Sequence, residues 1–134
     1  AELSKAGFEI AYPTRRASHE FIVTMKDIKD KTGVTAMNLA KRLLDKGYHA
    51  PTTYFPMLVP ECLLIEPAET ESKETLDAFV SSMKEILQEI EQQPDMVKGA
   101  PHTMSVRKLD DVKAARELDL TWKPSALSKS QASR

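Results

Sequence analysis

The chain contains little cysteine and glycine and no long apolar run. Its single cysteine, Cys62, excludes a disulfide within the chain and a zinc site built from several cysteines. The 4 glycines form no phosphate-binding motif, and no stretch of 18 apolar residues is present. The first residues also lack the basic start and apolar run of a signal peptide. We therefore expect a soluble protein. Its low cysteine content fits a reducing, cytoplasmic compartment, although a cysteine-poor secreted chain would look similar.

The chain also lacks an excess of charge of either sign. Its 19 basic side chains oppose 20 acidic ones, which gives a formal net charge of -1. A nucleic-acid binder or a polybasic membrane patch needs a clear positive excess, so neither is expected. With 134 residues, 41% of them apolar, the chain has the composition of one compact domain that buries a core without disulfides or metal.

The spacing of apolar residues predicts an α/β fold. Alternation predicts strands at 8–12 and 19–25, paired as a hairpin, and a buried strand at 61–66. Helical spacing predicts helices at 36–46 and 72–92, whereas 26–31 indicates a short irregular turn. Each helix has one apolar stripe that needs a sheet to cover it. We expect a two-layer domain with a mixed sheet covered on one face by helices, and the stripe of the longer helix buried: Leu76, Phe79, Met83 and Leu87.

The composition changes towards the C-terminal end. We expect residues 1–97 to form the domain and residues 98–123 to form an extension with, at most, a short helix around 111–118. Residues 124–134 are mostly Ser, Ala and Lys and are expected to form a disordered tail. The chain begins with Ala1 rather than Met and reaches a strand almost at once, so we expect it to be a piece of a longer protein.

No catalytic constellation is visible in the residues themselves. The histidines His19, His49 and His102 lie far apart, and no pair has the spacing of metal ligands, so we expect no metal site. Cys62 lies within an apolar run and is expected in the core rather than as a nucleophile. A group of acidic residues could supply an acid and a base, but such residues more often stay solvated near a helix start: Glu61, Glu66, Glu69, Glu71 and Glu74.

Two other features leave a function open. Arg15 and Arg16, in the expected hairpin turn, could bind an anion, although exposed arginines usually face water. Residues 48–60 contain three prolines and several aromatic residues, a composition that favours a rigid, extended loop. Long ordered loops of this kind are often functional. From the residues alone, the chain is an α/β domain with one unusual loop and no assigned reaction.

Three segments, taken in order, resemble one family. They are residues 32–52 (TGVTAMNLAKRLLDKGYHAPT), residues 65–79 (IEPAETESKETLDAF) and residues 100–103 (APHT). Together they resemble the C-terminal end of the P-protein of the glycine cleavage system, the pyridoxal-phosphate-dependent glycine decarboxylase. The resemblance covers residues 7–123. Its last part, residues 107–116 (RKLDDVKAAR) with Trp122 soon after, is more similar to the second subunit of the split prokaryotic enzyme than to the single-chain form.

The resemblance implies the small C-terminal domain of a fold-type I pyridoxal-phosphate enzyme. The parent enzyme would decarboxylate glycine and transfer the aminomethyl group to the lipoylated H-protein, an oxidoreductase activity. The family's cofactor lysine directly follows a histidine, whereas here the histidines precede Glu20, Ala50 and Thr103. We therefore expect the cofactor lysine, and with it every catalytic residue, to lie outside this chain. The fragment alone is expected to bind no cofactor and to be inactive.

The resemblance also implies where this chain would contact the rest of the enzyme. The substrate-channel candidates are His49, Pro51, Thr52, His19 and His102. The interface candidates are Tyr54, Phe55, Met57, Met104 and Trp122, which are more apolar than loops of a short domain require. The expected partners are the remainder of subunit 2, the other P-protein subunit and the lipoylated H-protein. The extension at 98–123 is expected to pack on the missing large domain or on the partner subunit. The alternative from another class is a free-standing interaction or regulatory α/β domain without catalysis.

Overall fold

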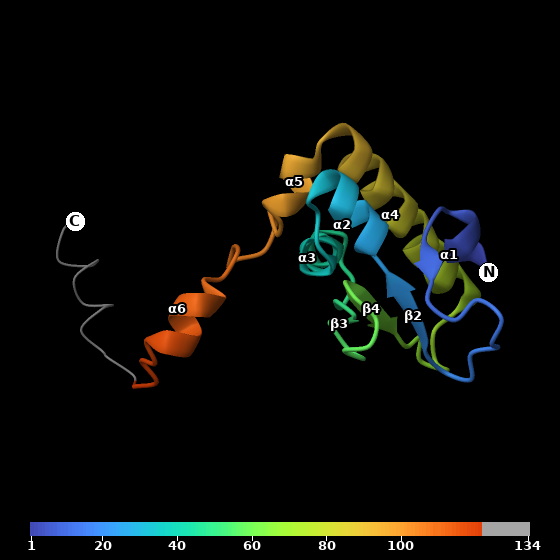
Figure 1. The fold of residues 1–134 in the computed structure, drawn as a ribbon, viewed down its shortest axis with the longest axis horizontal. Coiled ribbons are helices and arrows are strands. Elements are labelled where there is room, and N and C mark those ends of the chain that lie inside the picture. Colours follow the sequence, from blue (N-terminus) through green and yellow to red (C-terminus); the bar gives the residue numbers. More distant parts are fainter. Residues whose placement is uncertain (122–134) are drawn as a thin grey trace.

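The structure, a computed structural model, describes residues 1–121 and contains one four-stranded sheet (Figure 1). The strands are β1 (Glu9–Ile10), β2 (Phe21–Thr24), β3 (Thr52–Thr53) and β4 (Cys62–Ile65), in the order β1-β2-β4-β3. The α/β class is confirmed. All three pairings are antiparallel, so the expectation of a mixed sheet was wrong in this detail. A parallel pair needs a long crossover between adjacent strands, and β1–β2 and β3–β4 are joined directly by loops.

The described residues form six helices. The predicted helices at 36–46 and 72–92 are confirmed as α3 (Ala36–Asp45) and α4 (Lys73–Gln92). The short helix expected near 111–118 is α6 (Asp111–Arg116), and the others are α1 (Glu2–Lys5), α2 (Lys26–Thr32) and α5 (Pro94–Lys98). Among the described helices, none combines the length and the apolar character needed to cross a membrane.

The interpretation of residues 26–31 as an irregular turn was wrong, because they belong to helix α2. This helix buries no residue completely, and only Ile28 and Thr32 are partly covered, so it has no apolar stripe for periodicity to detect. Its contacts with the rest of the fold are few: Ile28 packs against the core, and Lys29 pairs with Glu61. Lys26 pairs with Asp30 one turn on, at 2.8 Å, and Gly33 ends the helix in the left-handed region while its N–H bonds to the Lys29 carbonyl.

Helix α3 begins and ends with strong local signals. The Thr35 side chain accepts a hydrogen bond from the Asn38 N–H, and the Asn38 side chain accepts one from the Thr35 N–H, which forms a capping box. Glu61, far along the chain, accepts from the Ala36 N–H at 3.1 Å and receives a salt bridge from Lys29 at 2.7 Å. These contacts fix the start of α3 against the turn that enters β4.

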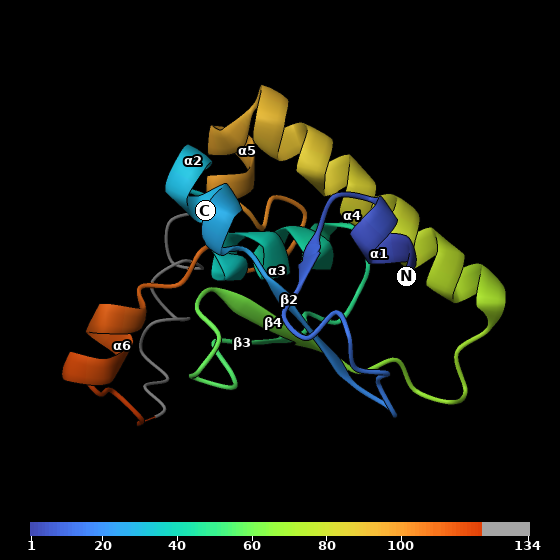
Figure 2. The ribbon, with the colours of Figure 1, turned by 45° about the vertical axis from the view of Figure 1, so that its right-hand side comes forward.

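The core lies between one face of the sheet and the helices above it (Figure 2). Val23 and Leu63 are register partners at the centre of the sheet and are fully buried. Leu39 and Leu43 of α3 and Met83, Ile86 and Ile90 of α4 pack in the same cluster. Within the stripe predicted for α4, Met83 is buried and Phe79 and Leu87 are half-buried, but Leu76 is 38% exposed. The burial of Leu76 was therefore predicted wrongly, because the first turns of α4 extend past the core.

The other face of the sheet is covered only in part, by the loop between β3 and β4. Thr24 donates from Oγ1 to the Pro60 carbonyl at 2.8 Å, and Cys62 Sγ lies 3.6 Å from the Pro56 carbonyl. Cys62 is fully buried, as predicted. Ile22 and Leu64, paired on the same face, are half-buried. This face therefore has a closed end under the loop and an open end at Ile22 and Leu64.

Candidate functional site

An open cleft of about 1180 Å³ lies at the open end of the sheet. It is bounded by Ala1 and the start of α1, the β1–β2 loop, the α3–β3 loop, the residues after β4 and the first turns of α4. His49, Pro51 and Thr52, three of the substrate-channel candidates, line it together. Arg15 and Arg16 line it as well. The structure thus brings into one cleft two features that the sequence presents separately.

The wall formed by His49, Pro51 and Thr52 is fixed at both ends. At its start, the Tyr48 N–H bonds to the Leu43 carbonyl at 3.0 Å, and the Tyr48 ring packs edge-on against Phe79 of α4 with centroids 5.3 Å apart. At its end, Thr52 pairs with Leu64 in the sheet. The His49 side chain, between these points, is exposed. The wall therefore holds a rigid backbone while its imidazole remains accessible.

The facing loop carries charged groups of both signs. Arg15 and Arg16 are exposed and form no ion pair with another described residue, while Glu20 brings a carboxylate to the same cleft. His19 lies between two residues that line the cleft, and its Nδ1 is 2.9 Å from Ser18 Oγ. Among the residues that the structure describes, no lysine lines the cleft. The cleft could thus hold a polar or zwitterionic group, but the described residues offer it no lysine amine for a covalent bond.

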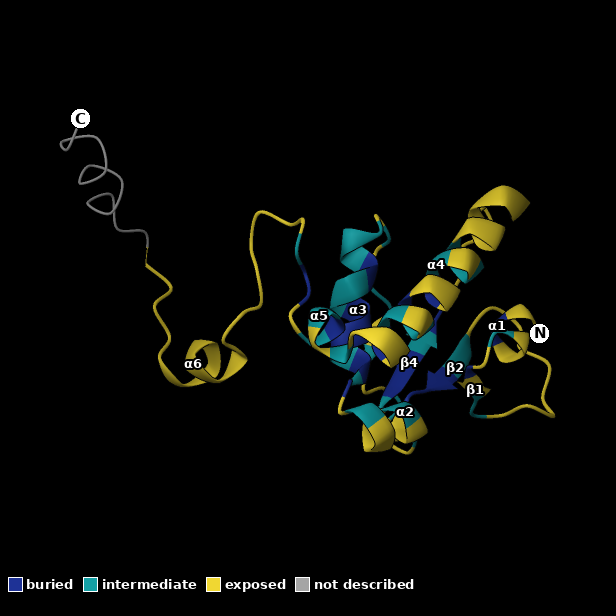
Figure 3. Ribbon diagram, turned by 90° about the horizontal axis from the view of Figure 1, so that it is seen from above, coloured by how far each residue is buried: buried dark blue, intermediate teal, exposed yellow. Residues whose placement is uncertain are grey.

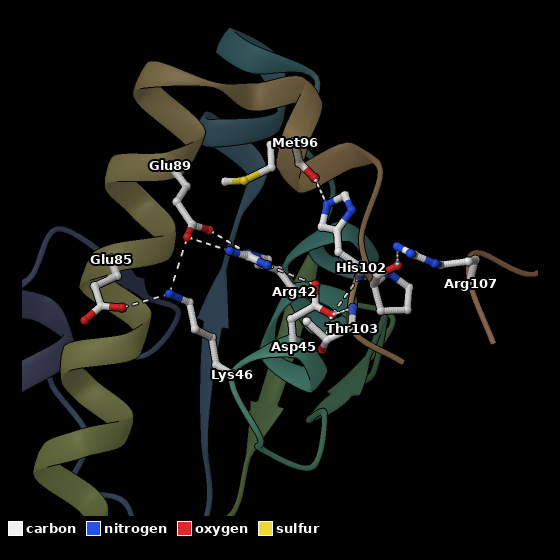
Figure 4. Close-up of polar contacts among 10 residues, drawn as sticks. Arg42, Asp45, Lys46, Glu85, Glu89, Met96, His102, Thr103 and Arg107 are labelled. Atoms are coloured by element: carbon white, nitrogen blue, oxygen red, sulfur yellow. Dashed lines mark hydrogen bonds and ion pairs between the residues drawn. The ribbon is translucent and has the colours of Figure 1, made fainter. Parts of the chain in front are cut away.

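His102, the remaining channel candidate, belongs to a different cluster (Figure 4). Its Nε2 donates to the Met96 carbonyl at 2.7 Å, and its backbone N–H donates to Asp45 Oδ1 at 2.7 Å. Thr103 adds two further bonds to the same carboxylate oxygen, from its N–H at 2.8 Å and from its Oγ1 at 2.9 Å. The structure therefore places His102 where the chain leaves α5 and does not bring it to the cleft.

Asp45 is the centre of this cluster, and its side chain is only 1% exposed. Burial by itself would raise the pKa of Asp45, but the hydrogen bonds from Thr103, Arg42 and His102 outweigh it and lower the pKa to about 2. Arg42 reaches Asp45 Oδ2 at 3.0 Å and binds Glu89 of α4 through two bonds of 2.8 Å. The bidentate contact raises the pKa of Arg42 and lowers that of Glu89. The cluster joins α3, α4 and the segment after α5.

The remaining candidates for a chemical role, Cys62 and the acidic residues, lie in positions that do not favour catalysis. Burial raises the pKa of the Cys62 thiol, which disfavours the thiolate that a nucleophile needs. Glu61 caps α3, and the other acidic candidates are exposed: Glu66, Glu69, Glu71 and Glu74. Among the residues that the structure describes, no three His, Cys, Asp or Glu side chains are placed to hold a metal ion.

The interface candidates within the described residues all have exposed side chains. Phe55 and Met57, in the loop between β3 and β4, are 58% and 90% exposed. Tyr54 in the same loop and Met104 after α5 are also exposed. Trp122 lies outside the described residues. An interface needs exposed apolar side chains of this kind, and the interface itself stays a prediction.

The sequence reasoning missed Asp45 and Arg42. Their spacing of three residues on a helix signals a local ion pair. It does not signal Glu89, 47 positions from Arg42, or Thr103, 58 positions from Asp45. Those partners are brought together only by the packing of α4 and α5 against α3.

The comparisons with known proteins all point to the same family. Residues 1–107 match the family model described as "Glycine dehydrogenase, C-terminal domain". The chain is 85% identical over 123 residues to a "Probable glycine dehydrogenase (decarboxylating) subunit 2" from Nitrosospira multiformis, covering 92% of this chain and 25% of the relative. Proteins of the same name from Nitrosomonas europaea and Thiobacillus denitrificans are 84% and 74% identical over 124 and 126 residues, each covering 26% of the relative and 92% and 94% of this chain. The chain spans about a quarter of the length of these curated relatives.

Proposed function

The chain belongs to the family of the glycine dehydrogenase C-terminal domain, and on that premise we propose that it is the C-terminal quarter of subunit 2 of the decarboxylating enzyme. The whole protein, with its complementary subunit, would decarboxylate glycine and pass the aminomethyl group to the lipoylated H-protein in the cytoplasm. One observation carries the proposal, namely 85% identity over 123 residues to a subunit 2 relative. It favours this function over a free-standing interaction or regulatory domain.

This chain does not fit the role of covalent cofactor holder. Pyridoxal phosphate is bound in such enzymes by a lysine amine, and no lysine lines the cleft of the described residues. No lysine of the chain directly follows a histidine. The cofactor lysine would therefore be supplied by the rest of subunit 2. No chemical step is assigned here to residues 1–121.

The role proposed for this chain is to form one wall of the substrate channel. His49, Pro51 and Thr52 are held rigidly by the α3 cap and the sheet, which suits groups that must keep their position while a substrate passes. His19 extends the same surface on the facing loop. His102 would not be part of this wall, because its ring is bonded to Met96 and its backbone N–H to Asp45 in the other cluster.

The parts of the chain would then divide as the composition suggests. Residues 1–97 would be the small domain, and residues 98–123 an extension that packs on the remainder of the enzyme. Tyr54, Phe55, Met57 and Met104 would contribute to contacts with the rest of subunit 2 or with the other subunit, and the proposal includes Trp122, which lies outside the described residues.

The activity is tested with the complete subunit 2 that contains this chain, assembled with its complementary subunit, pyridoxal phosphate and H-protein. Release of labelled CO₂ from carboxyl-labelled glycine is the expected result, and its absence from the assembled enzyme contradicts the proposed function. The wall is tested with His49→Gln and Thr52→Val, which we expect to lower kcat/KM about tenfold or more if the two side chains orient substrate.

Thr70→Val is the matched control for the wall, because Thr70 is also exposed but does not line the cleft. It should leave kcat/KM within a factor of two or so of the wild type. Equal rates for the His49, Thr52 and Thr70 variants would leave the parent activity intact and remove the channel role from this wall.

A further inference from the structure

The segment from Met104 to Thr121, called the arm below, carries apolar side chains that nothing in the described chain covers. Every residue of the arm is exposed, and Figures 1 and 3 show α6 apart from the body of the domain. The apolar residues recur along its whole length: Val106, Leu109, Val112, Leu118 and Leu120, with exposed fractions from 56% to 86%. A soluble chain rarely exposes so many apolar side chains in sequence unless they bind something.

The helix within the arm needs a surface to pack on. Helix α6 has six residues and buries none of them. Asp110 caps it, accepting from the Lys113 N–H at 2.9 Å, and the last turn carries Arg116. Those local contacts are small, and helices shorter than about 12 residues are marginal in water without tertiary packing. A bound surface would supply the missing stabilisation through Val112 and its apolar neighbours.

The residues just before the arm, 101–103, are held in a defined position. Asp45 binds the N–H groups of His102 and Thr103, and Arg107 donates to the Pro101 carbonyl at 3.4 Å. Pro101 itself is buried. The arm therefore leaves the body from a fixed point beside α3 and α5 (Figure 4). Because its start is already fixed, the arm loses less conformational entropy on binding than a fully free segment would.

The position of the arm indicates what covers it. On the proposed function, the rest of subunit 2 precedes Ala1, which lies beside α1 at the end of the domain opposite α6 (Figure 1). The arm thus extends away from the point where its own large domain joins. Its charges balance, four basic against four acidic residues, so its apolar side chains rather than a net charge provide the attraction. The three subunit 2 relatives described above align over 123 to 126 residues, beyond the 107 of the family model, so they share at least part of the arm.

We propose that the arm is a docking element that binds an apolar groove on the complementary subunit of the enzyme. The inference rests on the proposed function and adds to it the segment that recognises the second subunit. Asp45 is the positioning residue, since it directs the arm without being part of the contact. The groove would accept an extended chain interrupted by one short helix, with Val112, Leu118 and Leu120 as its main apolar contacts.

The experiment uses the complete subunit 2 and the separately purified complementary subunit. The triple variant Val112→Ser, Leu118→Ser and Leu120→Ser should weaken their association on the order of a hundredfold, measured by isothermal titration calorimetry. Leu118→Ser alone should weaken it about tenfold. The paired control Lys113→Ser and Glu117→Ser changes polar residues of the same arm and should leave the affinity within about threefold.

Thermal unfolding and sedimentation of isolated subunit 2 separate the possible occupants of the arm. We expect both to be unchanged in the triple variant. A lowered melting temperature would overturn the proposal, because the arm would then pack on its own chain. Loss of self-association with unchanged affinity for the other subunit would overturn it in favour of a second copy. Unchanged affinity in all variants would also overturn it, whereas failure of the assembled wild type to release CO₂ from glycine would count against the proposed function instead.

Discussion

The carboxylate of Asp45 accepts a hydrogen bond of 2.8 Å from the backbone N–H of Thr103, across 58 positions of sequence. It thereby joins the last residue of α3 to the segment that follows α5. Arg42 extends the same contact to Glu89 of α4. A buried carboxylate is stable only when its charge is compensated, and here two backbone N–H groups, a hydroxyl and a guanidinium compensate it.

The first prediction concerns the pH dependence of stability. The pKa of Asp45 is about 2 in the fold, below its unfolded value near 3.9. Its contribution, about 2 kcal/mol, is therefore present above pH 5 and is lost as the pH falls towards 2. In urea unfolding at pH 6 and pH 3, the wild type should lose about 1 kcal/mol more than Asp45→Asn over this interval.

Asp95→Asn is the control for this measurement, because the Asp95 side chain is 96% exposed. Its stability should follow the wild type between the two pH values. If Asp45→Asn also followed the wild type, the carboxylate would not be held ionised by the contacts around it.

The second prediction compares two members of the α4 stripe. Met83 is fully buried, whereas Leu76 is 38% exposed beside the cleft. Met83→Ala should lower the free energy of unfolding by about 2 to 5 kcal/mol, because it removes buried atoms and leaves a cavity. Leu76→Ala should change it by about 1 kcal/mol or less. Equal losses in chemical denaturation would contradict the burial difference between the two positions.

The sequence was sufficient to predict a helix or strand where local signals and the pattern of buried residues agree. The helix predicted at 36–46 agrees with α3, which Thr35 caps and Gly47 follows in the left-handed region, and the strand predicted at 19–25 contains β2 with its buried Val23. It was insufficient for α2, which contributes only Ile28 to the core and is otherwise held by the Lys29–Glu61 and Lys26–Asp30 pairs and by its glycine end rather than by an apolar stripe. Apolar periodicity reports burial, so a helix that buries little leaves no trace in it.

In the candidate site, the sequence could not predict which residues far apart along the chain lie together. The motif containing His49 and Thr52 could be identified as a wall candidate from the sequence. That the wall faces Arg15 and Arg16 depends on the antiparallel order of the sheet, which places the start of β2 beside the end of β4. His102 was grouped with His49 by resemblance, but its backbone bond to Asp45 holds it elsewhere.

The third prediction concerns the end of α3. Gly47 has φ = 84°, and an added Cβ would meet no atom within 4 Å. Only backbone strain therefore opposes a side chain here. Gly47→Ala should cost about 1 kcal/mol in the free energy of unfolding, and Gly47→Asn clearly less, because asparagine tolerates the left-handed region. An Ala variant as stable as the wild type would show that the α3–β3 loop can relax.

The fourth prediction concerns the cofactor. Mixed with a stoichiometric amount of pyridoxal phosphate and reduced with borohydride, this chain should give no adduct on one unique lysine. Among its described residues no lysine lines the cleft, and no lysine of the sequence directly follows a histidine. It should also show no glycine-dependent CO₂ exchange. Peptide mass spectrometry checks the first outcome, and a single stoichiometrically labelled lysine would place a cofactor site within this chain.

The last prediction concerns the loop between β3 and β4, which has two different sides. Pro56 and Pro60 offer their carbonyls to Cys62 and Thr24 beneath it, so the loop belongs to the fold of the domain. Met57 and Leu58, at 90% and 89% exposure, face away from the domain. If these side chains meet the rest of the enzyme, their surroundings lose water there while the inner contacts remain the same.

Hydrogen exchange of this chain alone and within the complete two-subunit enzyme distinguishes the two sides. Protection of the amides in residues 48–58 and 100–122 should rise in the complete enzyme, because exposed loops open at little cost until another surface covers them. The Leu63 and Ile65 amides in β4, already in the sheet, should change less and serve as the internal reference. Equal protection of residues 48–58 in both samples would show that the apolar side chains of this loop serve the domain itself, and the stand-alone reading of residues 1–97 would then gain support.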